Sequence, residues 1–313
     1  MTALVLLLKD GERELREGVM DCLLSLNPAP TEWVVVDDGS KDRGSDLVKE
    51  KLPQATLVSH NDTEGFARSA NDGIRATEAP TLCLLNQDCR LPVDWLGRAQ
   101  NLLFEKKRAA ATSGALIRKD GRVDSEGHLL WSDWVCTEKG EGLEPNKCDE
   151  PQEVFGLSAT APVFRREALD AVAIEGMIFD ESFGSYLEDV DLNIRLRHLG
   201  WQSWLFPGKP AVHDRGSTGA RKALAIRRQG GRNYLRYLVK NLSEAERRRA
   251  AFPCAVGHLW GFFRDPLAAT LGLGETERLF FSRNEIRERR TATDREIAKW
   301  ISGFRLNPWR KRR

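Results

Sequence analysis

Apolar runs and amphipathic segments alternate along the first hundred residues of the chain. Four short, nearly continuous apolar runs are typical of buried strands: "ALVLLL" (3–8), "EWVVVDD" (32–38), "ATLVSH" (55–60) and "APTLCLLN" (79–86). Segments with helical spacing of apolar residues lie between and after them, at 12–26, 44–52, 65–76 and 93–107. Apolar strands that alternate with helices predict an α/β fold, with a mostly parallel central sheet and helices on both faces.

The pattern changes after residue 120. Residues 120–157 mix glycine, tryptophan and acidic residues with short alternating runs such as "HLLWSDW", which predicts an antiparallel or loop-rich insertion. Beyond it we expect a helix in "PVFRREALDAV", a second helix after "ESFGSYLEDVD", and strands in "WQSWLF" and "KPAVHDRGS". We predict a domain over 1–219, with halves of about 1–118 and 119–219, and a helical C-terminal region over 220–313.

Composition and charge narrow the class of protein. The 313 residues are 41% hydrophobic and 30% charged, as in an ordinary globular protein. The six cysteines lie far apart without a C-x-x-C pair, so we expect reduced thiols in a cytoplasmic protein. The first apolar run is too short for a signal peptide or a spanning helix. G-x-G-x-x-G does not follow it, which disfavours a dinucleotide-dependent oxidoreductase.

The net charge of +2 hides an asymmetry between the two predicted regions. Residues 220–313 hold 23 Lys and Arg against 9 Asp and Glu, which leaves 25 against 37 for residues 1–219. A basic region beside an acidic body suggests an anionic partner, either a membrane surface or a nucleic acid. A solvated helical appendage or an oligomer contact is the alternative.

Polar residues gather where the predicted strands end. In parallel α/β sheets, ligands bind beyond the carboxyl ends of the strands. Asp37 and Asp38 precede a Gly-Ser turn, where a carboxylate either accepts hydrogen bonds from a nucleotide or caps the next helix. Asn61 and Gly65 precede another helix, whose N-terminus either binds an anion or is an ordinary cap.

Four more residues carry candidate chemistry. Asp88 follows a central strand and is either a metal ligand or a turn residue. Glu188 and Asp189 begin a helix, where carboxylates serve as caps or deliver a general base. His213 follows an apolar run and is either structural or a metal ligand.

The order of these motifs resembles the inverting glycosyltransferases of family 2, which have the GT-A fold. The resemblance is closest to their rhamnosyltransferase-like and galactofuranosyltransferase-like branch, and it covers roughly residues 2–241. The stretches that carry it are "WVVVDDGSKD", "NDTEGFARSANDGI", "LCLLNQDCRLPVDWL", "FDESFGSYLEDVDLNIRLRHLGW" and "RNYLRYLVKNL".

The resemblance implies a role for each candidate residue. Asp38 would contact the base of a sugar-nucleotide donor, and the other implied donor contacts are Asp37, Asn61, Gly65, Asn71 and Asn86. Asp88 and His213 would bind Mg²⁺ or Mn²⁺. Asp189 would be the general base, with Glu188 orienting the acceptor or acting as the base itself. Asp191 and Arg195 would form a structural pair four residues apart on the helix.

Two departures from the family pattern leave questions open. The metal motif reads Asn86-Gln87-Asp88 and keeps one carboxylate, so a non-catalytic module that binds a sugar nucleotide or glycan is the alternative to an enzyme. The first strand ends in Lys9-Asp10 where relatives carry a different nucleotide-contacting pair, which leaves uridine and thymidine donors both open.

The resemblance also suggests a cellular setting. Such enzymes build bacterial surface polysaccharide, including lipopolysaccharide, often on polyprenyl-linked glycan acceptors and with sugars such as rhamnose. The basic region carries Trp260, Phe262, Phe263, Trp300 and Trp309, which would suit peripheral binding to the cytoplasmic face of the inner membrane. Trp131 and Trp134 in the insertion would either stack on sugar rings or pack in the core.

Overall fold

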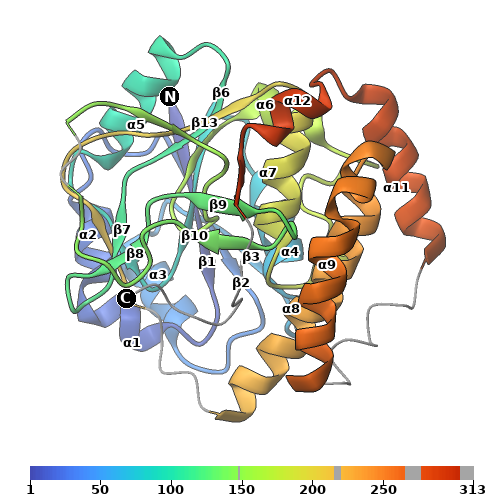
Figure 1. Ribbon diagram of the computed structural model, residues 1–313. Helices are drawn as coiled ribbons and strands as arrows, with labels where there is room; N and C mark the ends of the chain where they lie inside the picture. The colour runs from blue at the N-terminus through green and yellow to red at the C-terminus, as the bar shows by residue number, and fades with distance from the viewer. Residues whose placement is uncertain (147–148, 215–219, 265–275, 304–313) are drawn as a thin grey trace.

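The computed structural model describes residues 1–146, 149–214, 220–264 and 276–303, without the side chains of residues 220–224, 227, 257–264 and 276–281. Its centre is an eight-stranded sheet (Figure 1). The strand order across this sheet is β11 (Gln152–Val154), β13 (Gln202–Leu205), β6 (Ala109–Ser113), β12 (Val163–Arg165), β4 (Thr81–Asn86), β1 (Thr2–Leu8), β2 (Glu32–Asp37) and β3 (Thr56–Ser59).

The sheet is mostly parallel, as the sequence predicts. The strands β4, β1, β2 and β3 are parallel to one another, and so are β13 and β6. Two strands run antiparallel to their neighbours, β12 between β4 and β6, and β11 beside β13. The strand β12 corrects the prediction of an uninterrupted helix over 162–172, because Val163 and Phe164 are apolar enough to fill the centre of the sheet before the helix begins.

Helices cover both faces of this sheet. The elements in the first two-thirds of the chain are α1 (Glu12–Glu14), the π-helical turn η1 (Leu15–Val19), α2 (Met20–Leu24), α3 (Gly44–Lys51), α4 (Phe66–Arg75), α5 (Trp95–Glu105), α6 (Arg166–Val172), the 3₁₀ turn η2 (Glu181–Phe183) and α7 (Glu188–His198). The segment predicted as one helix over 12–26 is broken, since Gly18 lies at φ 116°.

Side-chain alternation along β1 explains the two apolar layers. Leu4 and Leu6 pack with η1, α2, α3 and α5 on one face, whereas Val5 and Leu7 pack with α4, α6 and α7 on the other. Successive strand residues point to opposite faces, so a strand buried on both sides must be apolar throughout. All seven residues of β1 are buried accordingly.

The predicted insertion contributes strands to two small sheets that also contain strands from elsewhere in the chain. One contains β5 (Cys89–Arg90), β14 (Ala211–His213), β7 (Leu116–Ile117) and β8 (Val123–Ser125), in that order. The other contains β10 (Cys136–Glu138), β9 (His128–Trp131) and β15 (Ile301–Ser302). Within this insertion Trp134 is 1% exposed and packs against Tyr237, so it belongs to the core rather than to a sugar-binding surface.

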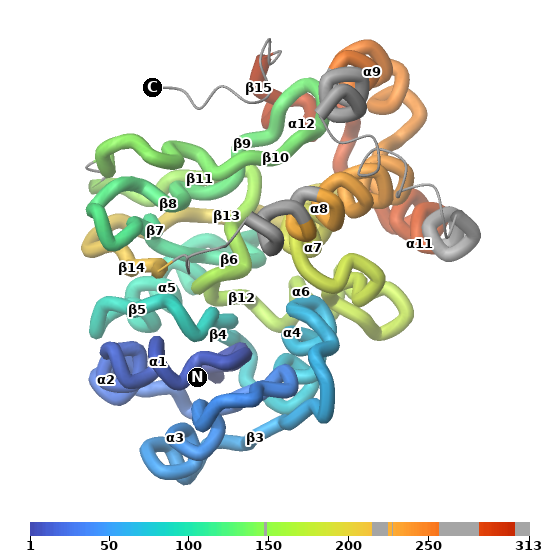
Figure 2. The backbone as a smooth tube through the Cα atoms, turned by 90° about the horizontal axis from the view of Figure 1, so that it is seen from below, coloured from blue at the N-terminus to red at the C-terminus, as the bar shows by residue number. Residues whose placement is uncertain are grey.

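The C-terminal region packs against the body through α7. Its elements in the described part of the chain are α8 (Ala220–Asn241), α9 (Glu244–Arg264), α11 (Thr276–Arg289), α12 (Asp294–Ala298) and β15. Figures 1 and 2 show α8, α9 and α11 gathered on the side of the molecule where α7 lies. Tyr237 and Ile297 from this region share an apolar cluster with Phe183, Val190 and Ile194, which joins the region to the helix that carries Glu188 and Asp189.

Candidate functional site

The carboxyl ends of β1, β2 and β4 lie next to one another and bring the predicted polar residues to one edge of the sheet. At the end of β2, Asp37 accepts hydrogen bonds from the Ser40 amide (2.9 Å) and the Ser45 hydroxyl. Burial raises the pKa of Asp37, but these hydrogen bonds outweigh it and leave the pKa below its usual value. Asp37 therefore holds the Gly-Ser turn as an anion.

Asp38 connects this turn to the start of α4. Its Oδ1 accepts from the Glu64 amide (2.8 Å) and lies 3.0 Å from Nδ1 of His60, while its Oδ2 accepts from the Gly65 amide (3.1 Å). Burial raises the pKa of Asp38, but the bonds from His60 and Glu64 bring the pKa below its usual value. Asp38 is thus an ionised side chain that organises the loop between β3 and α4.

The three other residues predicted on this loop and in α4 lie in different environments. Asn61 is exposed on the loop. Gly65 lies at φ 95°, and a Cβ there would stand 3.2 Å from the Gly184 carbonyl oxygen, so this close approach favours glycine. Asn71 is buried on α4, donates to the Phe179 carbonyl (2.8 Å) and accepts from the Phe179 amide (2.9 Å). Its amide is used to hold the Phe179 backbone, and the nucleotide contact at Asn71 stays a prediction.

The end of β4 and the turn after it carry three polar residues, each with a different set of contacts. Gln87 donates to the Lys9 carbonyl (2.7 Å) and accepts from the Lys9 amide, which ties the ends of β4 and β1 together. Asn86 has a buried side-chain oxygen without a hydrogen-bond partner among the described residues. Asp88 follows, and its backbone carbonyl accepts from the Asp214 amide (2.8 Å). This bond brings β14 and its histidine to the same edge.

Asp88 and His213 meet, as predicted for a metal pair. In β14, His213 pairs with Cys89, so its ring stands beside Asp88, with Nε2 3.3 Å from Oδ1 of that carboxylate. The other ring nitrogen, Nδ1, lies 2.7 Å from Oδ2 of Asp124, a residue of β8 that is 1% exposed. Burial lowers the pKa of His213, but the bonds to Asp124 and Asp88 raise it to about 9.

This donor set fits a divalent cation that is shared with a substrate. One carboxylate and one imidazole at the sheet edge leave coordination positions for phosphate oxygens, an arrangement that hard cations use with nucleotide substrates. Asp124 holds the His213 ring through Nδ1 and leaves Nε2 toward Asp88, as an outer carboxylate does for a ligating histidine. In the described part of the chain, no cluster of three or more His, Cys, Asp or Glu side chains is arranged to hold a metal by itself.

A second acidic centre lies at the start of α7. Tyr186 and Leu187 have φ of 72° and 69°, a left-handed turn that directs the chain into the helix at Glu188. Asp189 accepts from the Val190 amide (2.8 Å) and the Ala159 amide (3.3 Å). Oε2 of Glu188 is buried and lacks a hydrogen-bond partner among the described residues.

The two carboxyl groups differ in their electrostatic environment. Burial, followed by the neighbouring Asp189 charge, raises the pKa of Glu188 well above its usual range. Burial also leaves the pKa of Asp189 above its usual value, while His128 and the backbone amides of Ala159 and Val190 limit the rise. Of the two, Asp189 is therefore the better proton acceptor, and Glu188 is the better donor of a hydrogen bond.

The two centres are physically connected. The Asn86 amide donates to the Thr160 carbonyl (2.9 Å), and the Ala159 amide contacts Asp189, so one short segment touches both. The N-terminus of α4 contributes a second link, since the Ala67 amide donates to the Gly184 carbonyl (2.8 Å) just before the turn into α7. Asp88 with His213 and Glu188 with Asp189 are thus linked through short backbone segments.

Sequence reasoning missed three residues of this arrangement. Asp124, His128 and Glu138 all come from the insertion after residue 120. The alternating pattern of "HLLWSDW" indicates strands there, but it does not reveal which polar residues point to the site. Nε2 of His128 lies 3.6 Å from a carboxylate oxygen of both Asp189 and Glu138. The insertion therefore contacts both centres, His213 through Asp124 and Asp189 through His128.

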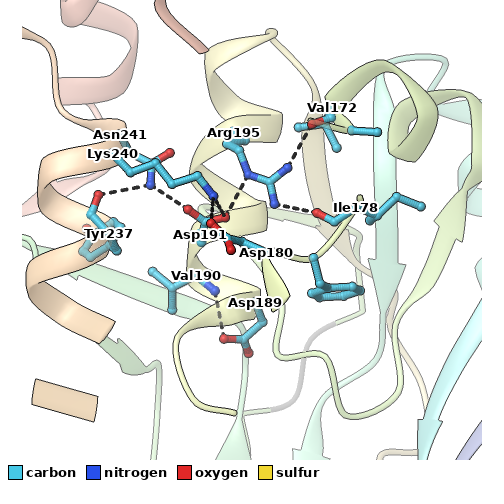
Figure 3. Close-up of polar contacts among 12 residues, drawn as sticks. Val172, Ile178, Asp180, Asp189, Val190, Asp191, Arg195, Tyr237, Lys240 and Asn241 are labelled. Atoms are coloured by element: carbon cyan, nitrogen blue, oxygen red, sulfur yellow. Dashed lines mark hydrogen bonds and ion pairs between the residues drawn. The ribbon is translucent and has the colours of Figure 1, made fainter. Parts of the chain in front are cut away.

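The predicted pair of Asp191 and Arg195 is confirmed, with Nε 2.9 Å from Oδ2. Lys240 of α8 also reaches Oδ2 of Asp191 at 2.9 Å and Oδ2 of Asp180 at 2.8 Å. Figure 3 shows Lys240 reaching from α8 toward Asp191 and Arg195 on α7, the helix that also carries Asp189. The amide of Asn241 donates to the other oxygen of Asp191 (2.8 Å).

Comparison with protein families and curated proteins shows which known proteins this chain is similar to. The model of the family "Glycosyl transferase family 2" matches residues 12–173. An N-acetylglucosaminyl-diphospho-decaprenol L-rhamnosyltransferase of Mycobacterium tuberculosis is 27% identical over 223 residues, which cover 61% of this chain and 69% of that protein.

Solved structures show a similar fold. A crystal structure of GalNAc-T7 with UDP, GalNAc and Mn²⁺ superposes with a TM-score of 0.66 at 12% identity, covering 92% of this chain and 54% of that one, so the match spans about half of GalNAc-T7. The mannosyltransferase PcManGT of Pyrobaculum calidifontis, in complex with GDP-Man and Mn²⁺, superposes with a TM-score of 0.56 at 15% identity, covering 96% of this chain and 82% of that one. These likenesses establish the GT-A fold.

Proposed function

Because the chain belongs to glycosyl transferase family 2, we propose that it is an inverting, metal-dependent enzyme that transfers a sugar from a nucleoside-diphosphate donor to a glycan acceptor. The observation that carries the proposal is the meeting of Asp88 with His213 at the sheet edge, linked through residues 159–160 to Asp189. A diphosphate leaving group and a hydroxyl nucleophile need these two kinds of centre side by side.

On the donor side, Asp88 and His213 would hold Mg²⁺ or Mn²⁺. The bound cation would neutralise the charge that develops on the leaving diphosphate. Asp124 keeps Nε2 of His213 directed to the metal side. The nucleotide would lie over the ends of β1, β2 and β4, near Asp38 and Asn86. The side-chain oxygen of Asn86 has no hydrogen-bond partner among the described residues.

On the acceptor side, Asp189 would take the proton from the attacking hydroxyl. The hydroxyl oxygen would form a bond to the anomeric carbon while the bond from that carbon to the diphosphate breaks on the opposite face. This single displacement inverts the anomeric configuration. Glu188, which is buried and favours its protonated form, would hydrogen-bond the acceptor.

The curated relative suggests which sugar and acceptor to test first. That protein's name specifies transfer of L-rhamnose to N-acetylglucosaminyl-diphospho-decaprenol. We propose a related reaction for this chain, with rhamnose as the first sugar to test and a polyprenyl-linked glycan as the acceptor, in bacterial surface polysaccharide assembly. Lys9 stands at the end of β1 and donates to the Gly39 carbonyl (2.6 Å), where it would help to select the base.

The experiment that tests this function is a panel of uridine and thymidine nucleotide sugars, each assayed with Mn²⁺, with Mg²⁺ and with excess chelator. We expect one donor to raise the Tm of the protein only when metal is present, and to be consumed in transfer or slow hydrolysis. Chelation should abolish turnover. Full activity in the presence of chelator would contradict the role of Asp88.

Variants at the metal pair separate binding from catalysis. Asp88→Ala should abolish turnover, and His213→Ala should raise the metal concentration needed for half-maximal activity by about 10–100-fold, the usual cost of a disturbed metal shell. Asp46→Ala, which removes an exposed carboxylate on α3, is the control. The alternative, a non-catalytic binding module, is favoured by the single carboxylate of Asn86-Gln87-Asp88. A wild-type protein that binds a sugar nucleotide without turnover, and an Asp88→Ala variant that binds equally well, would support it.

We also propose that the basic C-terminal region binds an anionic membrane surface. Among the described residues no helix has the length and apolar character needed to cross a bilayer. Arg248, Arg249 and Phe252 are exposed on α9, Phe252 at 73%, and basic and aromatic side chains together suit a lipid interface. The side chains of Trp260, Phe262, Phe263 and Trp309 lie outside the described ones.

Sedimentation with vesicles measures this binding. Vesicles that contain an anionic lipid should retain the protein at moderate salt, whereas purely zwitterionic vesicles should not. A double variant, Arg248→Glu with Arg249→Glu, should reduce retention. Retention of the protein on double-stranded DNA, without retention on anionic vesicles, would favour nucleic acid as the partner instead.

A further inference from the structure

A buried histidine faces Asp189 from the neighbouring small sheet. His128 begins β9, is 4% exposed, and directs Nε2 toward two carboxylates. Nε2 lies 3.6 Å from Oδ2 of Asp189 and 3.6 Å from Oε1 of Glu138. The ring therefore stands between the residue we propose as the base and a second acidic side chain on β10.

Asn193 determines which ring nitrogen of His128 carries a hydrogen. Nδ2 of Asn193 donates to the Leu157 carbonyl (2.8 Å), which fixes the orientation of the amide. The same nitrogen lies 3.2 Å from Nδ1 of His128. An amide nitrogen only donates, so Nδ1 of the neutral ring accepts and the hydrogen resides on Nε2. The imidazolium carries a hydrogen at Nε2 as well, so in both states an N–H faces the carboxylates.

The surroundings of Asp189 and His128 are acidic. Glu188 and Asp191 come from α7 itself, while Glu138 and Cys136 come from β10. Burial lowers the pKa of His128, but Cys136 and Glu138 raise it well above its usual range. The N–H of His128 therefore stabilises negative charge on Asp189, where burial and Glu138 act against that charge.

We propose that His128 is a positioning residue, which keeps the carboxylate of Asp189 in its proton-accepting form by directing Nε2–H at it. This inference rests on the proposed function, because it assigns His128 to the service of the proposed base. His128 does not touch the reacting atoms in this scheme, and it acts through Asp189.

The pH dependence of transfer tests the assignment. Asp189 must be ionised to accept a proton, so the rate rises as pH increases through its pKa. His128→Phe removes the N–H and should raise that pKa, which moves the acidic limb of the kcat profile to higher pH by about one unit or more. The KM for the donor should stay unchanged. His128→Gln, which keeps an N–H donor, should retain part of the wild-type profile.

His198 offers a matched control. It lies at the other end of α7, is 1% exposed, and neither of its ring nitrogens has a hydrogen-bond partner among the described residues. Like His128, His198 is buried, and it lies on α7, the helix that carries Asp189. His198→Phe therefore removes a buried imidazole from that helix without changing a contact of Asp189. Its acidic limb should coincide with that of the wild type.

A second measurement does not require turnover. The side-chain carboxyl ¹³C resonance of Asp189, assigned by its absence in Asp189→Asn, should titrate at higher pH in His128→Phe and in His128→Gln than in the wild type, with the larger shift in the Phe variant. If His128→Phe does not fold, the Gln variant still gives this reading. An unchanged Asp189 titration in the folded variants overturns the proposal. If the wild-type protein shows no sugar transfer, but the His128 variants show the expected shift in the titration of Asp189, only the proposed function is overturned.

Discussion

Asp189→Asn is expected to lower kcat for sugar transfer by about 10²–10⁴-fold, the usual contribution of a positioned general base. The amide has nearly the same shape as the carboxylate, but it cannot accept the proton of the acceptor hydroxyl. Its side-chain oxygen can still accept from the Val190 amide, so the start of α7 should keep its conformation. Donor binding, measured as a rise in Tm with nucleotide sugar and metal, should remain close to that of the wild type.

Glu188→Gln is the comparison that identifies the base. Glu188 is buried, its pKa lies well above the usual range, and it is the neutral partner of the pair. Its replacement by Gln keeps a hydrogen-bond donor and should cost much less in kcat than Asp189→Asn. A reversed order, with Glu188→Gln inactive and Asp189→Asn near the wild-type rate, would assign the base to Glu188.

The first half of the fold could be predicted from sequence because its periodicity is unambiguous. Strand β1 is buried on both faces, and its continuous apolar run has no helical alternative of that length. Strand β12 was missed for the opposite reason. Val163 and Phe164 directly precede the helix α6, and the short apolar pair gives no signal that separates a strand from the first turn of that helix.

The candidate site could be predicted only in part. Asp88 and Asp189 follow recognisable elements, a strand tip and a helix start, so their positions could be read from the chain. Asp124 and His128 reach the site through short strands of the insertion, and their importance depends on pairing with residues about 60 to 90 positions away. Local pattern does not contain that information, because the partner is chosen by the tertiary arrangement of β8, β9, β14 and α7.

Charge counting also gave an incomplete picture of the C-terminal region. Its basic excess indicated an anionic partner outside the protein, but some of these cations are used internally. Lys240 is 1% exposed and binds Asp180 and Asp191. Arg290 lies 2.9 Å from Oε1 of Glu246, with 10% and 2% of the two side chains exposed. Lys240 therefore neutralises acidic charge of the body, whereas Arg290 and Glu246 pair within the C-terminal region.

Lys240→Met is expected to destabilise the protein by about 3–5 kcal/mol, the cost of leaving a buried charge without its partner. Lys240 Nζ lies between Asp180 and Asp191, and Asp191 is 0% exposed. Burial raises the pKa of Asp180, but Lys240 lowers it well below its usual value. Methionine fills a similar volume, so the loss reports chiefly on charge. Urea denaturation of the variant and the wild type measures it.

The pH dependence of this loss identifies its electrostatic origin. An aspartate whose pKa is lowered by folding contributes stability above its unfolded pKa of about 3.9, and that stability is lost as pH falls toward the folded value. The gap between wild type and Lys240→Met should therefore be largest near neutral pH and narrow below about pH 4. A pH-independent gap would point to packing instead.

Arg248→Met supplies the matched control for Lys240→Met, since it also removes a cation from a C-terminal helix. Arg248 pairs with Glu244 on α9, but their side chains are 78% and 61% exposed, so the change should cost less than about 1 kcal/mol. A Lys240→Met cost as small as this would mean that the buried network does not hold α8 against α7. If the larger loss is observed, the C-terminal region is part of the support of the helix that carries Asp189, and its removal should impair the base as well as any surface contact.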